Sequence, residues 1–140
     1  LKELGTPDVV HWNNGLHDAG RKQTRDPVQY PLAEYLDNLA RILARLRAAG
    51  ARTVIWASTT PVHPTLPVPH PPWSWTNTDI DRYNAAAERF MRSEGVPVND
   101  LHTVVWQDWE QRLSEDRIHL SPAGQEACAQ AVAGMVLNCV

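Results

Sequence analysis

The sequence predicts an α/β domain in which helices cover both faces of a parallel sheet. Three apolar segments of strand length alternate along the chain with segments of helical periodicity, the pattern typical of such sheets. The second of these segments, Thr53 to Ala57, is apolar without alternation, as expected of a strand buried on both faces. Three strands are few for this architecture, so we expect the sheet to be incomplete.

Length and composition restrict the range of functions. The chain has 140 residues, which we take as one domain over residues 1–140, and its net charge of -3 argues against a nucleic-acid-binding surface. No apolar stretch approaches the roughly 18 residues of a membrane helix. Cys128 and Cys139 lie too far apart along one predicted helix to form a disulfide. No signal peptide is visible, and the cellular compartment stays unknown.

The first elements come before residue 31. Leu1 to Gly5 is typical of the last turn of a helix followed by its terminating glycine. Because chains rarely start inside a helix, we expect that sequence is missing upstream. Asp8 to Asn13 predicts a short buried strand, and residues 19–30, which are polar, predict a loop.

The clearest helix covers Pro31 to Ala49. Apolar residues recur in it at three- and four-residue steps. They are Leu32, Tyr35, Leu36, Leu39, Ile42, Leu43 and Leu46. Pro31 suits the first helical position and Gly50 the position just past the end.

A proline-dense loop separates the second strand from the next helix. It runs from Pro61 to Asn77 and holds six of the eleven prolines, which is typical of a functional or lid-like loop. Periodicity then predicts a helix over Asp79 to Glu94, capped by Thr78 with Asp81. A third short strand is expected at Val96 to Asp100.

The C-terminal part predicts one clear helix. Residues 102–113 have no clear pattern and are compatible with a helix, and a last helix is predicted from Pro122 to about Leu137 with Ser121 as its cap.

In open parallel sheets, ligands bind outside the carboxyl ends of the strands. The segments to inspect are Asn13 to Asp18, Ser58 to Pro61, and Asp100 onward.

Two residues just before the last helix could handle a proton. Asp116 and His119 are three positions apart, a spacing that can place a carboxylate beside an imidazole. A histidine acting as general base must hold one tautomer, and a carboxylate that accepts the Nδ1 proton fixes that tautomer. A surface aspartate and a histidine satisfied by the local backbone explain the spacing about twice as often.

Polar side chains also follow the first strand. Asn13 and His17 could donate hydrogen bonds to a developing oxyanion, and Gly15 permits a tight turn or close approach to a substrate. An Asn-Gly turn with Asp18 as a capping residue explains the same segment equally well.

Taken in order, these segments resemble the SGNH (GDSL-type) hydrolases. The family's third motif, Gly-x-Asn-Asp, matches Gly15-Leu16-His17-Asp18 with a histidine at the asparagine position. Its fifth motif, Asp-x-x-His, matches Asp116-Arg117-Ile118-His119. The resemblance covers nearly the whole chain. It implies a three-layer α/β/α flavodoxin-like sheet and ester hydrolysis by a Ser-His-Asp mechanism, with His119 as base and Asp116 as its orienter.

The family's Gly-Asp-Ser-Leu nucleophile motif and its second-motif glycine are absent, since both would precede residue 1. The resemblance therefore implies a truncated acyl or acetyl esterase that holds the catalytic dyad without its serine. Whether the chain is an enzyme by itself stays open. His17, Asn13 and Gly15 are the candidates for the oxyanion and substrate site. We expect no cofactor, metal, nucleic acid or membrane partner.

The expected partners are a small-molecule ester and a strand supplied by other sequence. The first strand would lie mid-sheet in the family's strand order, so its edge would be exposed here. That edge could pair with a missing N-terminal segment or mediate self-association.

Two other functions stay open. A non-catalytic binding or interaction fragment of the same fold is one, because Trp73 and Trp75 in the proline loop could stack on a sugar or acyl ligand. Packing of the loop onto the sheet explains these residues slightly better. A metal site is the other and is less favoured, because the six histidines lack the spacings of zinc ligands.

Overall fold

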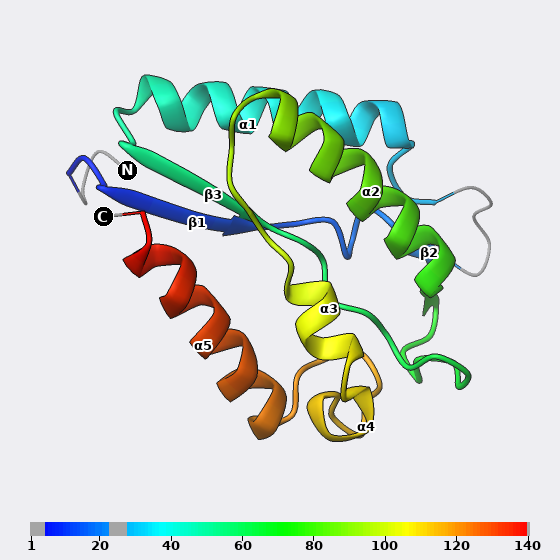
Figure 1. The fold of residues 1–140 in the computed structure, drawn as a ribbon. Coiled ribbons are helices and arrows are strands. Elements are labelled where there is room, and N and C mark those ends of the chain that lie inside the picture. The colour runs from blue at the N-terminus through cyan, green and yellow to red at the C-terminus, as the bar shows by residue number, and fades with distance from the viewer. Residues whose placement is uncertain (1–4, 23–27, 140) are drawn as a thin grey trace.

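A three-stranded parallel sheet forms the centre of the fold in the computed structural model, which describes residues 5–22 and 28–139 (Figure 1). Its strands lie in the order β1 (Val9–Asn13), β3 (Thr53–Ala57) and β5 (Val98–Asn99). The central strand β3 is almost entirely buried, as its continuous apolar sequence predicts. Because the strands are parallel, their carboxyl ends meet at one edge of the sheet, where β1 leads into the turn that begins at Asn13.

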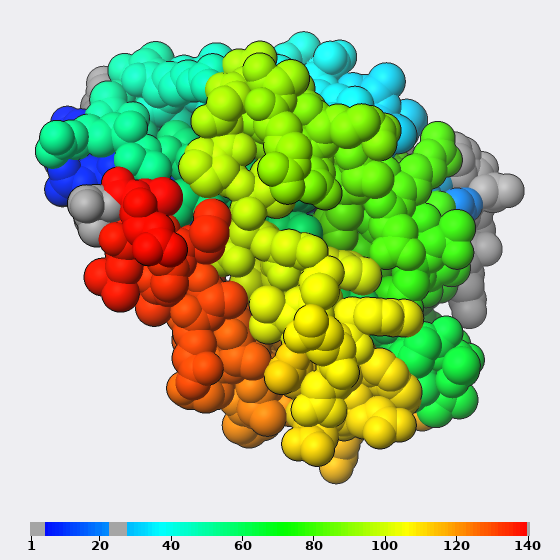
Figure 2. All heavy atoms as spheres, viewed as in Figure 1, coloured from blue at the N-terminus to red at the C-terminus, as the bar shows by residue number. Residues whose placement is uncertain are grey.

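Helices cover both faces of this sheet. Helices α1 (Leu32–Ala48) and α2 (Asn77–Ser93) lie together on one face (Figure 1). Helix α5 (Pro122–Leu137) covers the other face and packs against the short helices α3 (Leu101–Trp106) and α4 (Trp109–Arg112), beside which it runs in Figure 2. This arrangement confirms the predicted α/β fold with a three-stranded, helix-covered parallel sheet.

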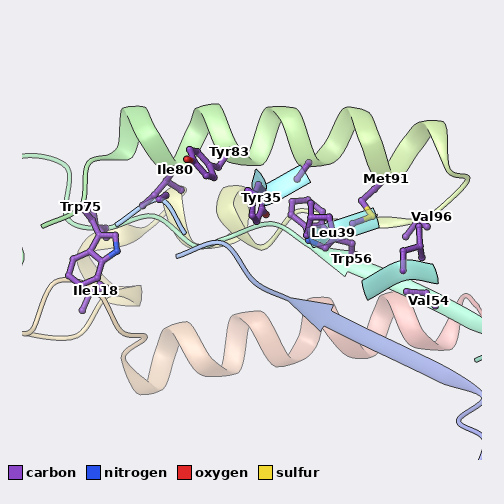
Figure 3. Packing of buried hydrophobic residues seen from close by; sticks show 14 of the residues in the cluster. Tyr35, Leu39, Val54, Trp56, Trp75, Ile80, Tyr83, Met91, Val96 and Ile118 are labelled. Carbon is purple, nitrogen blue, oxygen red and sulfur yellow. The ribbon is translucent and has the colours of Figure 1, made fainter. Parts of the chain in front are cut away.

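The larger core lies between the sheet and the first helical face. Tyr35, Leu39 and Leu43 stand four residues apart on α1, so they share one face of the helix and are at most 1% exposed. They pack with Trp56 of β3 and with an apolar stripe of α2 (Figure 3). Side chains of a strand alternate between faces, so Ala57 instead joins the second core beneath α3, α4 and α5.

Two helix starts differ from their predictions. Thr76, not Thr78, caps α2, because its hydroxyl accepts a hydrogen bond from the backbone N–H of Asp79. Pro31 is the cap of α1 rather than its first residue, since its carbonyl already accepts the bond from the Tyr35 N–H at 3.0 Å. The predicted cap of α5 is confirmed: the Ser121 hydroxyl accepts a hydrogen bond from the N–H of Gly124 at 3.1 Å.

Two segments predicted as loops contain a short antiparallel pair of strands. Strand β2 (Arg21–Lys22) pairs with β4 (Trp73–Ser74), and Lys22 lies opposite Trp73. The prediction of loops was wrong at these residues because each strand has only two residues and no alternation of its own. A bidentate contact from the Arg21 guanidinium to Asp79, with both distances 2.9 Å, holds β2 against the first turn of α2.

Predictions at the two ends of the chain have different outcomes. The helix turn expected at Leu1 to Leu4 lies outside the described residues. Cys128 and Cys139 are both free. A search of the described residues for a helix long and apolar enough to span a membrane finds none.

Candidate active site

Asp116 and His119 are in direct contact. The Nδ1 atom of His119 lies 2.5 Å from Oδ2 of Asp116. The other carboxylate oxygen accepts hydrogen bonds from the Ser114 hydroxyl at 2.6 Å and from the backbone N–H groups of Ile118 and His119 at 3.1 and 2.9 Å. Oxygen Oδ2 therefore faces the imidazole, and Nε2 on the far side of the ring stays available for another proton.

The chain returns on itself to make this turn. Leu113 and Leu120 pair as an isolated antiparallel bridge, and the N–H of Ser114 donates to the carbonyl of His119 at 2.8 Å. Arg117, in the middle of the turn, has a positive φ of 69°, which is uncommon for a residue with a side chain. Its guanidinium donates to the carbonyl of Pro67 at 2.7 Å and so ties the turn to the proline loop.

The start of α5 fixes the other end of the turn. A Cβ atom at Gly124 would lie 2.1 Å from the carbonyl oxygen of Arg112, so only glycine permits this approach. That same carbonyl accepts a hydrogen bond from the Ser121 N–H at 3.0 Å. The glycine that follows Leu-Ser-Pro-Ala in the sequence is therefore explained by a backbone contact that anchors the helix beside the turn.

The environment of Asp116 keeps its carboxyl group ionised. Partial desolvation raises its pKa, but the hydrogen bonds from the Ser114 hydroxyl, the His119 ring and two backbone amides act together in the opposite direction. The net effect holds the pKa of Asp116 well below its usual range. A carboxylate that stays charged at neutral pH can orient His119 and stabilise its protonated form.

The turn after β1 is built from long-range contacts. The carbonyl of Asn14 accepts hydrogen bonds from the Thr59 hydroxyl at 3.0 Å and from the Tyr35 hydroxyl at 3.3 Å. Gly15, with φ of +133°, is needed here because a Cβ atom would lie 2.5 Å from Thr59 Oγ1. The carbonyl of Leu16 accepts a hydrogen bond from Trp75 Nε1 at 2.8 Å.

Asn13 and His17 occupy different environments within this segment. The side-chain amide of Asn13 donates to the carbonyls of Ala57 and Ser58, both at 3.0 Å, so its two N–H bonds join the ends of β1 and β3. His17 is exposed and lines a pocket that His119 also lines. The structure therefore brings His17, but not the Asn13 amide, toward the Asp116–His119 pair.

The pocket shared by the two histidines has a volume of about 140 Å³. Its other lining residues are Leu16, His70, Trp73, Trp75 and Ile118. The side chain of His119 is 71% exposed and that of Asp116 is 46% exposed, so the pair is reachable from solvent. A larger hollow of about 610 Å³ lies beside Asp8 and Arg52, next to the amino ends of the strands and away from Asp116 and His119.

The other strand ends carry structural contacts. The Ser58 hydroxyl donates to Asp100 at 3.0 Å and accepts from the His102 N–H at 2.9 Å, so it joins β3 to the start of α3.

No group of three or more His, Cys, Asp or Glu side chains that could hold a metal ion occurs within residues 5–22 and 28–139.

Sequence reasoning missed part of the site. Ser114 supports Asp116 from two residues upstream, a local Ser-x-Asp pattern that sequence inspection could have recognised. His70 and Ile118 also line the pocket, although neither stood out in the sequence. Ile118 belongs to the Asp116–His119 turn itself, whereas only folding of the proline loop brings His70 to the pocket.

Comparison with known proteins identifies the fold and the family. The model of the GDSL-like lipase/acylhydrolase family matches residues 2–127. A search of curated proteins finds no match.

Solved structures share the fold at low identity. A lipase/acylhydrolase from Enterococcus faecalis aligns with a TM-score of 0.74 at 20% identity, over 93% of this chain and 61% of its own. An acetylxylan esterase from Geobacillus stearothermophilus aligns with a TM-score of 0.69 at 19% identity, over 91% of this chain and 58% of its own. The chain thus spans about three fifths of the length of these structures. Since the family model covers most of the sequence, the chain belongs to the GDSL-like lipase/acylhydrolase family.

Proposed function

We propose that this chain carries the acid–base half of a serine ester hydrolase, with His119 as general base and Asp116 as its orienter. The observation that supports this most strongly is the 2.5 Å contact between His119 Nδ1 and Asp116 Oδ2, because it leaves Nε2 free beside a pocket. Family membership supports ester hydrolysis as the reaction class. The expected substrate is a small-molecule carboxylic ester.

The proposed reaction needs a hydroxyl nucleophile. As the hydroxyl oxygen bonds to the ester carbonyl carbon, Nε2 of His119 accepts its proton and the carbonyl π electrons move to the oxygen. Collapse of this tetrahedral intermediate breaks the bond to the alkoxy group, which takes the proton from the imidazolium. Water then repeats the sequence on the acyl-enzyme and releases a carboxylic acid. Asp116, which stays charged, stabilises the imidazolium in both halves.

We assign the oxyanion contact to His17 rather than to Asn13. Both amide hydrogens of Asn13 are already donated to backbone carbonyls, and moving them would open the end of β1. His17 lies in the same pocket as His119 and has a ring N–H that can donate. Gly15 acts through the backbone, since its positive φ and the close approach of Thr59 shape the turn that carries His17.

The nucleophile is proposed to come from outside these 140 residues. The hydroxyls of Ser58, Ser93, Ser114 and Ser121 are all engaged in contacts with backbone or carboxylate groups, and Ser74 is not among the residues that line the pocket. We therefore expect the chain alone to hydrolyse p-nitrophenyl acetate far more slowly than a complete enzyme. Rapid turnover that is abolished by His119→Ala would show that a nucleophile lies within the chain and would overturn this part.

The dyad itself can be tested without catalysis. Long-range ¹H–¹⁵N spectra of the histidine rings report which nitrogen carries the proton. Neutral His119 is expected to carry it on Nδ1, where Asp116 can accept it, and Asp116→Asn is expected to shift the tautomer ratio. Glu115→Gln is the matched control, because Glu115 is an exposed acidic neighbour that lines a different pocket. Equal behaviour of the two variants would contradict the assignment.

We also propose the free edge of β1 as a surface for strand pairing. Within the described residues β1 pairs only with β3, and the strand is half-buried rather than buried. Unpaired strand edges promote association. The chain alone is therefore expected to form oligomers as its concentration rises. Cooperative unfolding of a monomer whose size by light scattering does not change with concentration would count against this proposal.

A further inference from the structure

The apolar part of the pocket beside His119 has a fixed shape. Trp75 and Ile118 are only 9% and 5% exposed and lie next to each other (Figure 3). The indole N–H of Trp75 donates to the carbonyl of Leu16 at 2.8 Å. A Cβ atom at Gly20 would lie 2.8 Å from that same nitrogen, so the backbone packs closely against the ring. These contacts hold Trp75 in one orientation.

Trp73 forms the more accessible part of the same wall. It belongs to β4 and is only partly buried, and its ring stacks on Trp75 with centroids 6.3 Å apart and planes inclined by 24°. The ammonium of Lys22, opposite it on β2, lies 5.5 Å from its ring centroid. Because an indole and a cation already contact Trp73, its ring is poorly available for stacking on a sugar.

The Arg21–Asp79 pair holds this wall in place. Strand β2 keeps Lys22 opposite Trp73, and its neighbour Arg21 is bound by Asp79 at the start of α2. The carboxylate also accepts a hydrogen bond from the Thr76 hydroxyl at 2.8 Å. The Arg21–Asp79 contact therefore links β2 to α2, and β2 in turn pairs with β4, which carries Trp73. The position of this wall thus does not depend on the proline loop alone.

The volume of the pocket limits what it can hold. At about 140 Å³ it is smaller than the roughly 300–1,000 Å³ of pockets that enclose whole ligands. A buried cavity of about 150 Å³ holds benzene, which has six carbon atoms. A butyryl group, with five non-hydrogen atoms, fits this limit, whereas an octanoyl group does not. The pocket thus suits one part of an ester whose remainder lies outside.

We infer that this pocket is the acyl-binding site and that Trp73 is the residue that limits it to acyl chains of about two to four carbons. This inference rests on the proposed function, because His119 and His17 define which end of the pocket meets the ester carbonyl. The side chains of Leu16, Trp75 and Ile118 contact the acyl chain of the substrate along its length. Methylenes beyond the pocket reach solvent and add no affinity.

Binding of carboxylates, the products of the proposed reaction, tests this inference without turnover. The ¹⁵N-labelled full chain is titrated with acetate, butyrate, hexanoate and octanoate at constant ionic strength, and the Nε1–H signals of its tryptophans are followed. Each buried methylene adds about 0.8 kcal/mol, or about fourfold in affinity. Butyrate is therefore expected to bind about fifteenfold more tightly than acetate, with little further gain for hexanoate or octanoate.

Trp73→Ala is expected to remove this limit. Hexanoate should then bind up to about fifteenfold more tightly than butyrate, since two more methylenes are buried. Trp73→Phe should give an intermediate gain and serves if the alanine variant folds poorly. Trp106→Ala is the matched control, because Trp106 is 43% exposed and stacks on His102 away from the pocket. This control should keep the wild-type order.

Three results would overturn the inference: no saturable binding of butyrate, a wild-type affinity that keeps rising through octanoate, or the same order in wild type and both Trp73 variants. The outcome is separable from that of the proposed function. If the affinity stops rising with carboxylate length but the tautomer test on Asp116→Asn fails, the pocket binds acyl groups without a hydrolase dyad. If the dyad is confirmed but the affinity does not level off with carboxylate length, only the acyl-site inference is removed.

Discussion

The two turns that line the pocket are held in different ways. In the Asp116–His119 turn, every hydrogen bond to the aspartate comes from a residue within three positions along the chain. In the turn after β1, the partners of Asn13, Asn14 and Leu16 lie between 21 and 59 positions away. The first turn is a local motif placed on the fold, whereas the second exists only once the fold has formed.

Because of this difference, substitutions in the two turns should affect different properties of the molecule. A change in the local turn should alter the Asp116–His119 pair, to which we assign proton transfer, and leave global stability nearly intact. A change in the long-range turn should destabilise the sheet, since it loosens the junction of β1, β3 and the first helical face. Substitutions in the two turns can break or sharpen this contrast, and their expected effects decrease in the order given.

Gly15→Ala should have the largest effect. The new Cβ atom would meet Thr59 Oγ1 at 2.5 Å and the Tyr35 hydroxyl at 3.1 Å, at a φ of +133° that other residues rarely adopt. Overpacking and backbone strain together should lower the free energy of unfolding by about 3–5 kcal/mol, measured by urea denaturation.

Gly134→Ala is the control for Gly15→Ala. Gly134 lies inside α5, and a Cβ atom added there would meet no neighbouring segment within 4 Å. Alanine at this position should stabilise the chain by about 0.5–1 kcal/mol. If the two substitutions gave similar changes, the turn after β1 would not depend on the close approach to Thr59.

Trp75→Phe should have the next largest effect. Phenylalanine cannot donate to the Leu16 carbonyl, which would lose its partner in the partly buried turn. The expected loss is about 2 kcal/mol in the free energy of unfolding. Trp106→Phe, at an exposed site, should change it by less than about 0.5 kcal/mol. Equal losses would show that the indole N–H contributes nothing specific.

Arg117 provides a smaller test inside the local turn. Glycine tolerates its φ of 69° without strain, whereas alanine does not, and both variants lose the contact with Pro67. Arg117→Gly should therefore be about 1 kcal/mol more stable than Arg117→Ala in urea denaturation. A more stable alanine variant would argue against a strained turn.

Substitutions that remove the charge of Asp18 or Asp116 should have the smallest effects on the free energy of unfolding, because both side chains are partly solvated and water screens them. Desolvation raises the pKa of Asp18, so its ionisation opposes folding, and Asp18→Asn should stabilise the chain at pH values above the raised pKa. The pKa of Asp116 is lowered, so its ionisation favours folding, and Asp116→Asn should destabilise the chain at neutral pH.

The two charge effects should vanish in different pH ranges. The gain from Asp18→Asn should disappear as the pH falls below the ordinary carboxyl value of about 4, where the unfolded chain is protonated as well. The loss from Asp116→Asn should shrink only as the pH falls below that same value toward the lowered pKa of the folded state. Urea denaturation at several pH values checks both signs, and shifts in the same direction would contradict the contrast between the turns.

Local patterns predicted much of this molecule. The apolar run at Thr53–Ala57, the periodicity of α1 and the Ser121-Pro122 start of α5 each correspond to an element found in the structure. Such features depend on residues a few positions apart, so the sequence shows them directly. The same reason made Asp116 and His119 visible as a pair.

Tertiary structure decided the rest. The two-residue strands β2 and β4, the commitment of the Asn13 amide to β3 and the placement of Trp73 and Trp75 beside His119 all join segments far apart in sequence. Nothing in the neighbourhood of these residues along the chain marks their partners. The sequence alone indicated Asp116 and His119 as the pair to which we assign proton transfer, and only the packing of the proline loop against both turns decided which side chains surround that pair. That division follows because hydrogen bonds within one turn require only local backbone geometry, while a pocket requires long-range packing.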